Sequence, residues 1–77
     1  MSKLTAIFAF VLNIDEASIT SELSPDNTAA WDSLNAIVLV TEIEKAFNVK
    51  FAYDEVMEIK NFDDITKLLV AKGVGEV

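Results

Sequence analysis

The chain has 77 residues, 13 of them acidic and 6 basic, which gives a formal charge of −7 at pH 7. This acidic balance disfavours nucleic-acid partners, whose phosphates it would repel, and favours partners with basic surfaces. The chain also lacks Cys and His, which excludes disulfides, thiol or imidazole catalysis and the usual zinc sites, so a domain this small must be stabilised by packing.

The first predicted element is a helix that ends near Leu12, with Ser2 as its N-cap and Asn13 as its C-terminal stop. Apolar residues recur at the i, i+3, i+4, i+7 spacing of one buried helix face: Leu4, Ile7, Phe8 and Val11. Phe10 lies off this face, and we expect it to rest under the loop that follows.

The same N-terminal stretch has the outline of a short signal peptide, because Lys3 precedes an apolar run over residues 4–12. No A-x-A cleavage site follows the run, and its apolar residues have helical periodicity. No stretch approaches the roughly 20 apolar residues of a membrane span. We therefore interpret residues 4–12 as part of the core and predict a cytoplasmic protein without a membrane span.

Residues 13–31 form a predicted long loop, which is rich in Ser, Thr, Asp and Asn and contains the chain's only Pro. A short helical turn is expected near residues 15–17. At the end of the loop, Trp31 should pack at the base of the next helix. Three apolar residues are expected to pin the loop to the bundle: Ile14, Ile19 and Leu23.

The segment from Trp31 to Phe47, WDSLNAIVLVTEIEKAF, predicts a helix of about four turns with Asp32 as its N-cap. At about 100° per residue this helix has two apolar faces. The first comprises Ala36, Leu39, Val40, Ile43, Ala46 and Phe47, and the second, on the opposite side, comprises Leu34, Ile37 and Val38 with Thr41. One apolar face would serve a core, so the second indicates burial from both sides or a docking surface.

Residues 48–52 are expected to form a loop that buries Phe51. Asp54 then caps a short predicted helix over about residues 55–59. Its residues should divide between core and water at helical spacing, with Val56 and Ile59 facing inward and Glu55 and Glu58 facing water.

The last predicted helix begins after its N-cap Asn61 and stops near Lys72 and Gly73, and the tail from Val74 should fray. Its expected core residues are Phe62, Ile65, Leu68 and Leu69. Together these elements predict an all-α fold. It is a small four-helix bundle, made of three main helices and one short helix with a long first loop, in a single domain over residues 1–77.

The polypeptide offers little for catalysis of its own. Its paired carboxylates look like solvated acids of helix first turns: Asp15-Glu16, Asp54-Glu55 and Asp63-Asp64. The loop pattern of calcium-binding helical proteins is absent, since no Gly precedes residue 73. We therefore predict neither an enzyme nor a metal site, and a carboxylate hydrolase is the least favoured hypothesis.

The D-S-L motif at residues 32–34 opens a predicted helix that ends in E-K-A-F at residues 44–47, and this arrangement resembles the acyl carrier protein family over nearly the whole chain. The resemblance implies that Ser33 carries 4′-phosphopantetheine, taken from coenzyme A, through a phosphodiester, with Asp32 as the adjacent motif residue. It implies a carrier that holds acyl groups as thioesters on this arm and presents them to enzymes of fatty-acid, polyketide or related biosynthesis. The alternative for Ser33 is an ordinary small polar residue in a helix first turn.

The resemblance also implies partners: a phosphopantetheinyl transferase, and acyl-loading, synthase or transferase enzymes with basic docking surfaces. The expected contacts lie on the second apolar face and its flanks: Leu34, Ile37, Val38, Thr41, Glu42 and Glu44. For Leu34 and Ile37 the alternative is burial under the short third helix or the long loop. We expect a monomer whose dockings are weak and quickly reversible.

Three features depart from the common family pattern. Ala30 stands where many members have Gly, and Val38 occupies a position that is often acidic in carriers of primary fatty-acid synthesis. Trp31-Asp32 is similar to discrete carriers of specialised pathways and to some peptidyl carrier domains. These departures favour a specialised carrier and leave two alternatives open: an aminoacyl or peptidyl carrier of a nonribosomal pathway, and an unmodified acidic helical interaction module.

Overall fold

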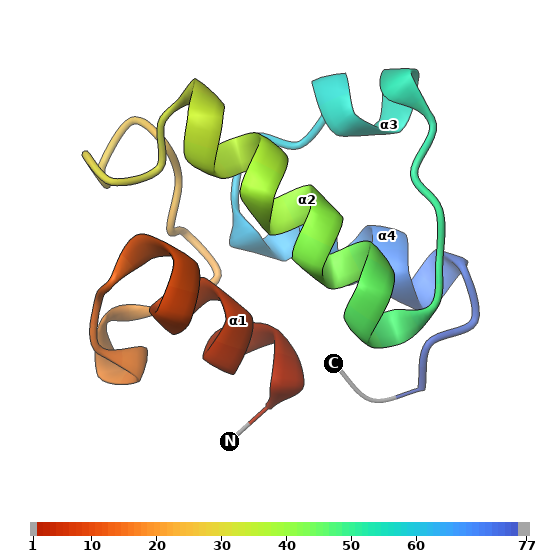
Figure 1. Cartoon of the computed structure of the whole chain (residues 1–77), viewed down its shortest axis with the longest axis horizontal. Helices are drawn as coiled ribbons and strands as arrows, with labels where there is room; N and C mark the ends of the chain where they lie inside the picture. The colour runs from red at the N-terminus through yellow and green to blue at the C-terminus, as the bar shows by residue number, and fades with distance from the viewer. Residues whose placement is uncertain (1, 76–77) are drawn as a thin grey trace.

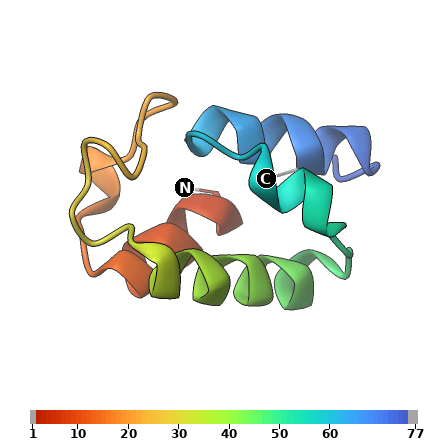
Figure 2. The ribbon, with the colours of Figure 1, turned by 90° about the horizontal axis from the view of Figure 1, so that it is seen from above.

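The structure is a computed structural model that describes residues 2–75. Its elements are α1 (Lys3–Leu12), the single 3₁₀ turn η1 (Glu16–Ser18), α2 (Ser33–Phe47), α3 (Tyr53–Met57) and α4 (Phe62–Ala71). Helix α2 crosses the molecule diagonally, with α1 beside it and α4 behind it (Figure 1). Seen from above, α2 and α4 lie along opposite sides, with α3 between them at one end (Figure 2). The described residues contain no strand, so the all-α prediction is confirmed.

Each of the three main helices begins at the polar side chain that the sequence predicts. Ser2 Oγ accepts a hydrogen bond from the Thr5 N–H, and the carboxylate of Asp32 and the amide oxygen of Asn61 do the same at α2 and α4. These caps satisfy N–H groups that have no partner inside the helix. The starts of α1, α2 and α4 are therefore fixed by interactions within four residues.

Helices α1 and α2 end at a residue in the left-handed region, and α4 is followed by one just after its C-cap Lys72. Gly adopts this region without strain, and Asn adopts it more readily than other residues with a side chain. Asn13 and Asn48 both have φ 55°, and Gly73 has φ 90°. Beyond Gly73, the Val74 N–H donates to the Leu69 carbonyl at 3.0 Å, and Val74 packs against the core. The expected fraying is therefore wrong for Val74, because this closing motif turns it back onto the bundle; residues 76–77 lie outside the described part.

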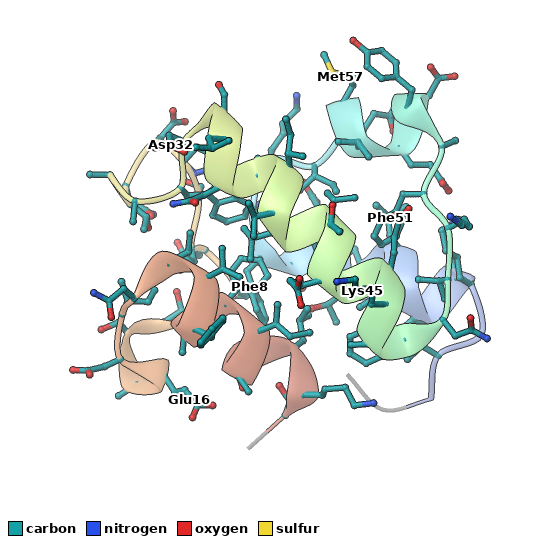
Figure 3. The ribbon with its side chains drawn as sticks, in the orientation of Figure 1. Phe8, Glu16, Asp32, Lys45, Phe51 and Met57 are labelled. Atoms are coloured by element: carbon teal, nitrogen blue, oxygen red, sulfur yellow. The ribbon has the colours of Figure 1, made fainter. Side chains whose placement is uncertain are left out.

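Phe8 lies at the centre of the core, between α1 and α2 (Figure 3). Its ring meets Trp31 and Phe62 edge to face, with centroids 5.2 Å and 4.9 Å apart. The loop before α2 and the start of α4 thus converge on one aromatic ring from α1, and the predicted packing of Trp31 and Phe62 is confirmed. The buried core residues are Leu4, Phe8, Leu12, Leu23, Trp31, Leu39, Ile43, Ile65 and Leu69.

Phe10 corrects one expectation, because its side chain is 85% exposed instead of lying under the loop. At about 100° per residue it points roughly 200° away from Phe8, to the side opposite the core. The loop runs elsewhere, since the Thr5 hydroxyl donates to Glu16 at 3.2 Å and holds η1 against α1.

Helix α3 corrects a second expectation. It begins at Tyr53 after Ala52, not after Asp54, because the carboxylate of Glu55 reaches back and accepts the Ala52 N–H at 2.7 Å. Glu55 is only partly exposed rather than free in water as predicted, and its carboxylate also lies 2.9 Å from the ammonium of Lys72 at the end of α4. No helix of the described chain is long and apolar enough to span a membrane.

Candidate functional site

The entrance of α2 is the most tightly specified local structure near the candidate serine. Asp32 accepts the Asn35 N–H at 2.8 Å through Oδ1, and its backbone carbonyl accepts the Ala36 N–H at 2.9 Å. The Asn35 side chain in turn donates to the Ala30 carbonyl at 2.7 Å, which ties the incoming loop to the first helical turn. This role of Asn35 was not predicted. The signal for it in the sequence is that its side-chain amide comes three residues after the N-cap Asp32.

Ser33 is the first residue of α2, and it is exposed. Among the residues that the structure describes, none forms a hydrogen bond with its hydroxyl or with the N–H groups of Ser33 and Leu34. Free N–H groups and the helix dipole make this end of a helix favourable for an anion. The carboxylate of Asp32 is a like charge beside it, so an anion here would extend outward into solvent.

One hollow adjoins the serine, and a second lies next to it; the two share the lining residues Pro25, Trp31 and Ala36. The outer one, of about 340 Å³, is open to solvent and reaches Asp32 and Ser33. The inner one, of about 100 Å³, is apolar and lies between α2, α3 and α4; the side chains that complete its lining are Leu39, Val40, Val56, Ile59 and Ile65. The outer hollow at Ser33 and the apolar inner hollow are therefore neighbours, with Trp31 and Ala36 in both linings.

The second apolar face of α2 is exposed in the structure. Leu34 is 70% and Ile37 is 65% exposed, so the alternative of burial under α3 or the loop is wrong for both. Val38 and Thr41 are also exposed beside them, although the Thr41 hydroxyl donates to the Ile37 carbonyl at 2.9 Å. The structure thus brings the predicted apolar contacts together on one continuous helix surface.

The two flanking acids differ in how free they are. Glu42 pairs with Lys45 of the same helix at 3.6 Å, a solvent-exposed contact that an incoming partner can replace. Glu44 accepts the Phe51 N–H at 2.9 Å through Oε2, so one of its oxygens is committed to the connection between α2 and α3. Of the two, Glu42 is the more available to a basic partner.

Two further exposed apolar side chains, Tyr53 and Met57, were not predicted. They are spaced by one helical turn on α3, and Met57 points away from the bundle (Figure 3). The i, i+4 spacing was the available signal, but it is visible only when the helix is started at Tyr53.

Comparison with known proteins points to one family. The family model described as "Phosphopantetheine attachment site" matches residues 2–69. The acyl carrier protein of Helicobacter pylori is 29% identical over 66 residues, which are 86% of this chain and 85% of that protein. The acyl carrier protein of Porphyromonas gingivalis is 36% identical over 53 residues, 69% of this chain and 68% of that protein.

Solved structures show the same architecture. The solution structure of a holo acyl carrier protein from Geobacter metallireducens superposes with a TM-score of 0.82 at 36% identity, covering 90% of this chain and 79% of that one. A putative acyl carrier protein from Mycobacterium tuberculosis superposes with a TM-score of 0.81, covering 90% and 92% of the two chains. At 23% identity the second likeness concerns the fold alone.

Proposed function

Because this chain belongs to the acyl carrier protein family, we propose that Ser33 is the residue that bears its covalent 4′-phosphopantetheine. The protein is a carrier and not an enzyme. The observation that carries the proposal for Ser33 is its exposed hydroxyl at the entrance of α2, free of hydrogen bonds to the other described residues. The free N–H groups beside it suit a phosphodiester, and the outer hollow leaves room for the arm.

The attachment reaction needs only a nucleophilic oxygen from this chain. Ser33 Oγ forms a bond to the phosphorus of the pantetheine-bearing phosphate of coenzyme A, and the bond from that phosphorus to the adenosine nucleotide breaks. The hydroxyl proton passes to a base that the transferase supplies. Once attached, the group supplies the thiol that this Cys-free chain lacks, and acyl groups are held on that thiol as thioesters.

The acyl class of cargo is supported by the inner cavity. Its lining is apolar, and it adjoins the hollow at Ser33. An apolar cavity of about 150 Å³ accommodates benzene, so the cavity of about 100 Å³ suits a short acyl chain in this conformation. The relatives named acyl carrier proteins support the same class, and fatty-acid, polyketide or related biosynthesis is the proposed setting.

The proposed partners are a phosphopantetheinyl transferase and the acyl-loading, synthase or transferase enzymes that exchange cargo with the arm. The exposed apolar face of α2 and the net charge of −7 favour partners with an apolar contact ringed by basic side chains. Electrostatic attraction mainly speeds encounter, which suits a carrier that visits several enzymes in turn. We propose that it acts as a monomer in the cytoplasm, where such enzymes and coenzyme A are found together.

Intact mass spectrometry tests the assignment of Ser33. After incubation with coenzyme A and a broad-specificity transferase, the wild-type chain should gain one phosphopantetheine, and Ser33→Ala should gain none. Ser21→Ala, which removes another exposed hydroxyl, should be modified like wild type. Absence of any addition, while a control carrier is modified, would instead favour an unmodified interaction module.

A further inference from the structure

Helix α3 is the most weakly anchored wall of the inner cavity. It has five residues, and none of them is fully buried. Val56 of α3 and Ile59, two residues after the end of α3, line the cavity together with residues of α2. An isolated helix of this length is unstable in water, so the position of α3 must depend on contacts with other elements.

One ion pair supplies such a contact. The ammonium of Lys72, at the end of α4, lies 2.9 Å from Glu55 Oε1, and the two side chains are only 23% and 33% exposed. The other two ion pairs of the described chain, Lys67 with Asp63 and Lys45 with Glu42, each lie within a single helix and are more exposed. Among the ion pairs of residues 2–75, only the Glu55–Lys72 pair joins two elements.

Neighbouring groups reinforce this pair. Glu55 also accepts the Ala52 N–H, and the ammonium of Lys72 lies 5.5 Å from the centre of the Phe51 ring. Phe51 is part of the segment that leads into α3, and its side chain lies between that segment and α2 (Figure 3). The Ala52 N–H first, and then Lys72, stabilise the charged carboxylate and lower the pKa of Glu55 from its ordinary value. Lys72 therefore meets both the first turn of α3 and the segment before it.

We propose that Lys72 is a positioning residue for the cargo: through Glu55 it holds α3 against the cavity and so limits the access of water to a bound acyl thioester. The inference about cargo rests on the function proposed above, whereas the hold on α3 does not. A segment with few buried contacts unfolds locally at a low free-energy cost. A single ion pair can therefore measurably change the fraction of molecules in which α3 is open.

The hold on α3 is tested in the unmodified protein by amide hydrogen exchange of Val56 and Ile59, whose N–H groups donate within and just after α3. Glu55→Gln keeps an acceptor for the Ala52 N–H, and Lys72→Met keeps the aliphatic stem over Phe51, so each removes mainly the charge. Each should raise exchange about two- to five-fold, the range of a partly exposed ion pair, and the double variant should raise it no further.

The matched controls are Lys67→Met, which breaks a pair inside α4, and Lys72→Arg, which keeps the pair with Glu55. Both should exchange like wild type in α3. Unchanged exchange in the Glu55 and Lys72 variants, or effects that simply add in the double variant, would overturn the hold on α3.

The effect on cargo is tested in the holo protein loaded with a butyryl thioester, by its rate of cleavage with hydroxylamine. Lys72→Met should cleave about two- to five-fold faster than wild type, while Lys67→Met and Lys72→Arg should match wild type. If Lys72→Met and wild type cleave at equal rates while exchange in α3 is raised, the role of Lys72 in shielding cargo is overturned, but its hold on α3 is not. If Ser33 takes no arm, the proposed function fails, and the exchange measurement still decides the hold on α3 by itself.

Discussion

Ile37 and Glu42 offer a partner two different contacts on the exposed side of α2. Ile37 presents an apolar side chain that no described element covers, and Glu42 presents a carboxylate held only by the exposed Lys45. Apolar anchors at the centre of an interface contribute mainly to affinity, and rim charges contribute mainly to the rate of encounter. The two residues should therefore act on transferase recognition in separable ways.

We expect Ile37→Asp and Glu42→Lys each to slow phosphopantetheine transfer. Transfer to Ile37→Asp should be about five- to ten-fold slower, because losing an apolar interface contact usually costs more than about 1 kcal/mol of binding free energy. The initial rate of mass gain measures it, and circular dichroism should show unchanged helicity. Val70→Asp on α4 and Glu22→Lys in the long loop are matched exposed controls that should react like wild type. Wild-type rates for both Ile37→Asp and Glu42→Lys would remove this surface from transferase docking.

At the scale of elements, the ends of the helices are fixed as sharply as their starts. Gly73 closes α4 at φ 90°, which lets Val74 return to the core. A Cβ at Gly73 would meet no atom within 4 Å, so any cost of adding one comes from the backbone conformation and not from a clash.

Gly73→Ala should therefore lower the free energy of unfolding by about 1–2 kcal/mol, the cost of holding an L-residue in the left-handed region. Gly75 also has open space around its Cβ position and has no left-handed φ, so Gly75→Ala should change stability by less than about 0.5 kcal/mol. Urea unfolding followed by circular dichroism measures both. Equal stability of the two variants would show that the closing turn does not need Gly.

The whole molecule depends on one aromatic cluster. Phe8 joins α1 to Trp31 of the loop and to Phe62 of α4, so its ring lies where segments far apart in the chain meet. In a domain without disulfides, such a contact supports a large share of the total stability.

Phe8→Ala should lower the free energy of unfolding by about 3–5 kcal/mol. A domain of this size usually has a free energy of unfolding of about 5 kcal/mol or little more, so most of its stability would be lost. We expect loss of cooperative thermal unfolding, measured by calorimetry. Phe10→Ala removes the same side chain from the exposed side of the same helix and should shift stability by less than about 0.5 kcal/mol. A cooperative transition in Phe8→Ala at the wild-type temperature would contradict the central role of this ring.

The amino-acid sequence by itself determined the starts of the main helices, the two faces of α2 and the placement of Ser33 in the first turn. The reason is that caps such as Asp32 and Asn61 act through hydrogen bonds that span three residues, and that helical periodicity assigns the faces before any packing occurs.

Only the tertiary structure decided the pairing of Glu55 with Lys72, the exposure of Phe10 and the apolar cavity between α2, α3 and α4. Each of these depends on how segments distant in the chain lie against one another. Glu55 and Lys72 meet only because the end of α4 passes beside α3, and no pattern within either segment encodes that approach.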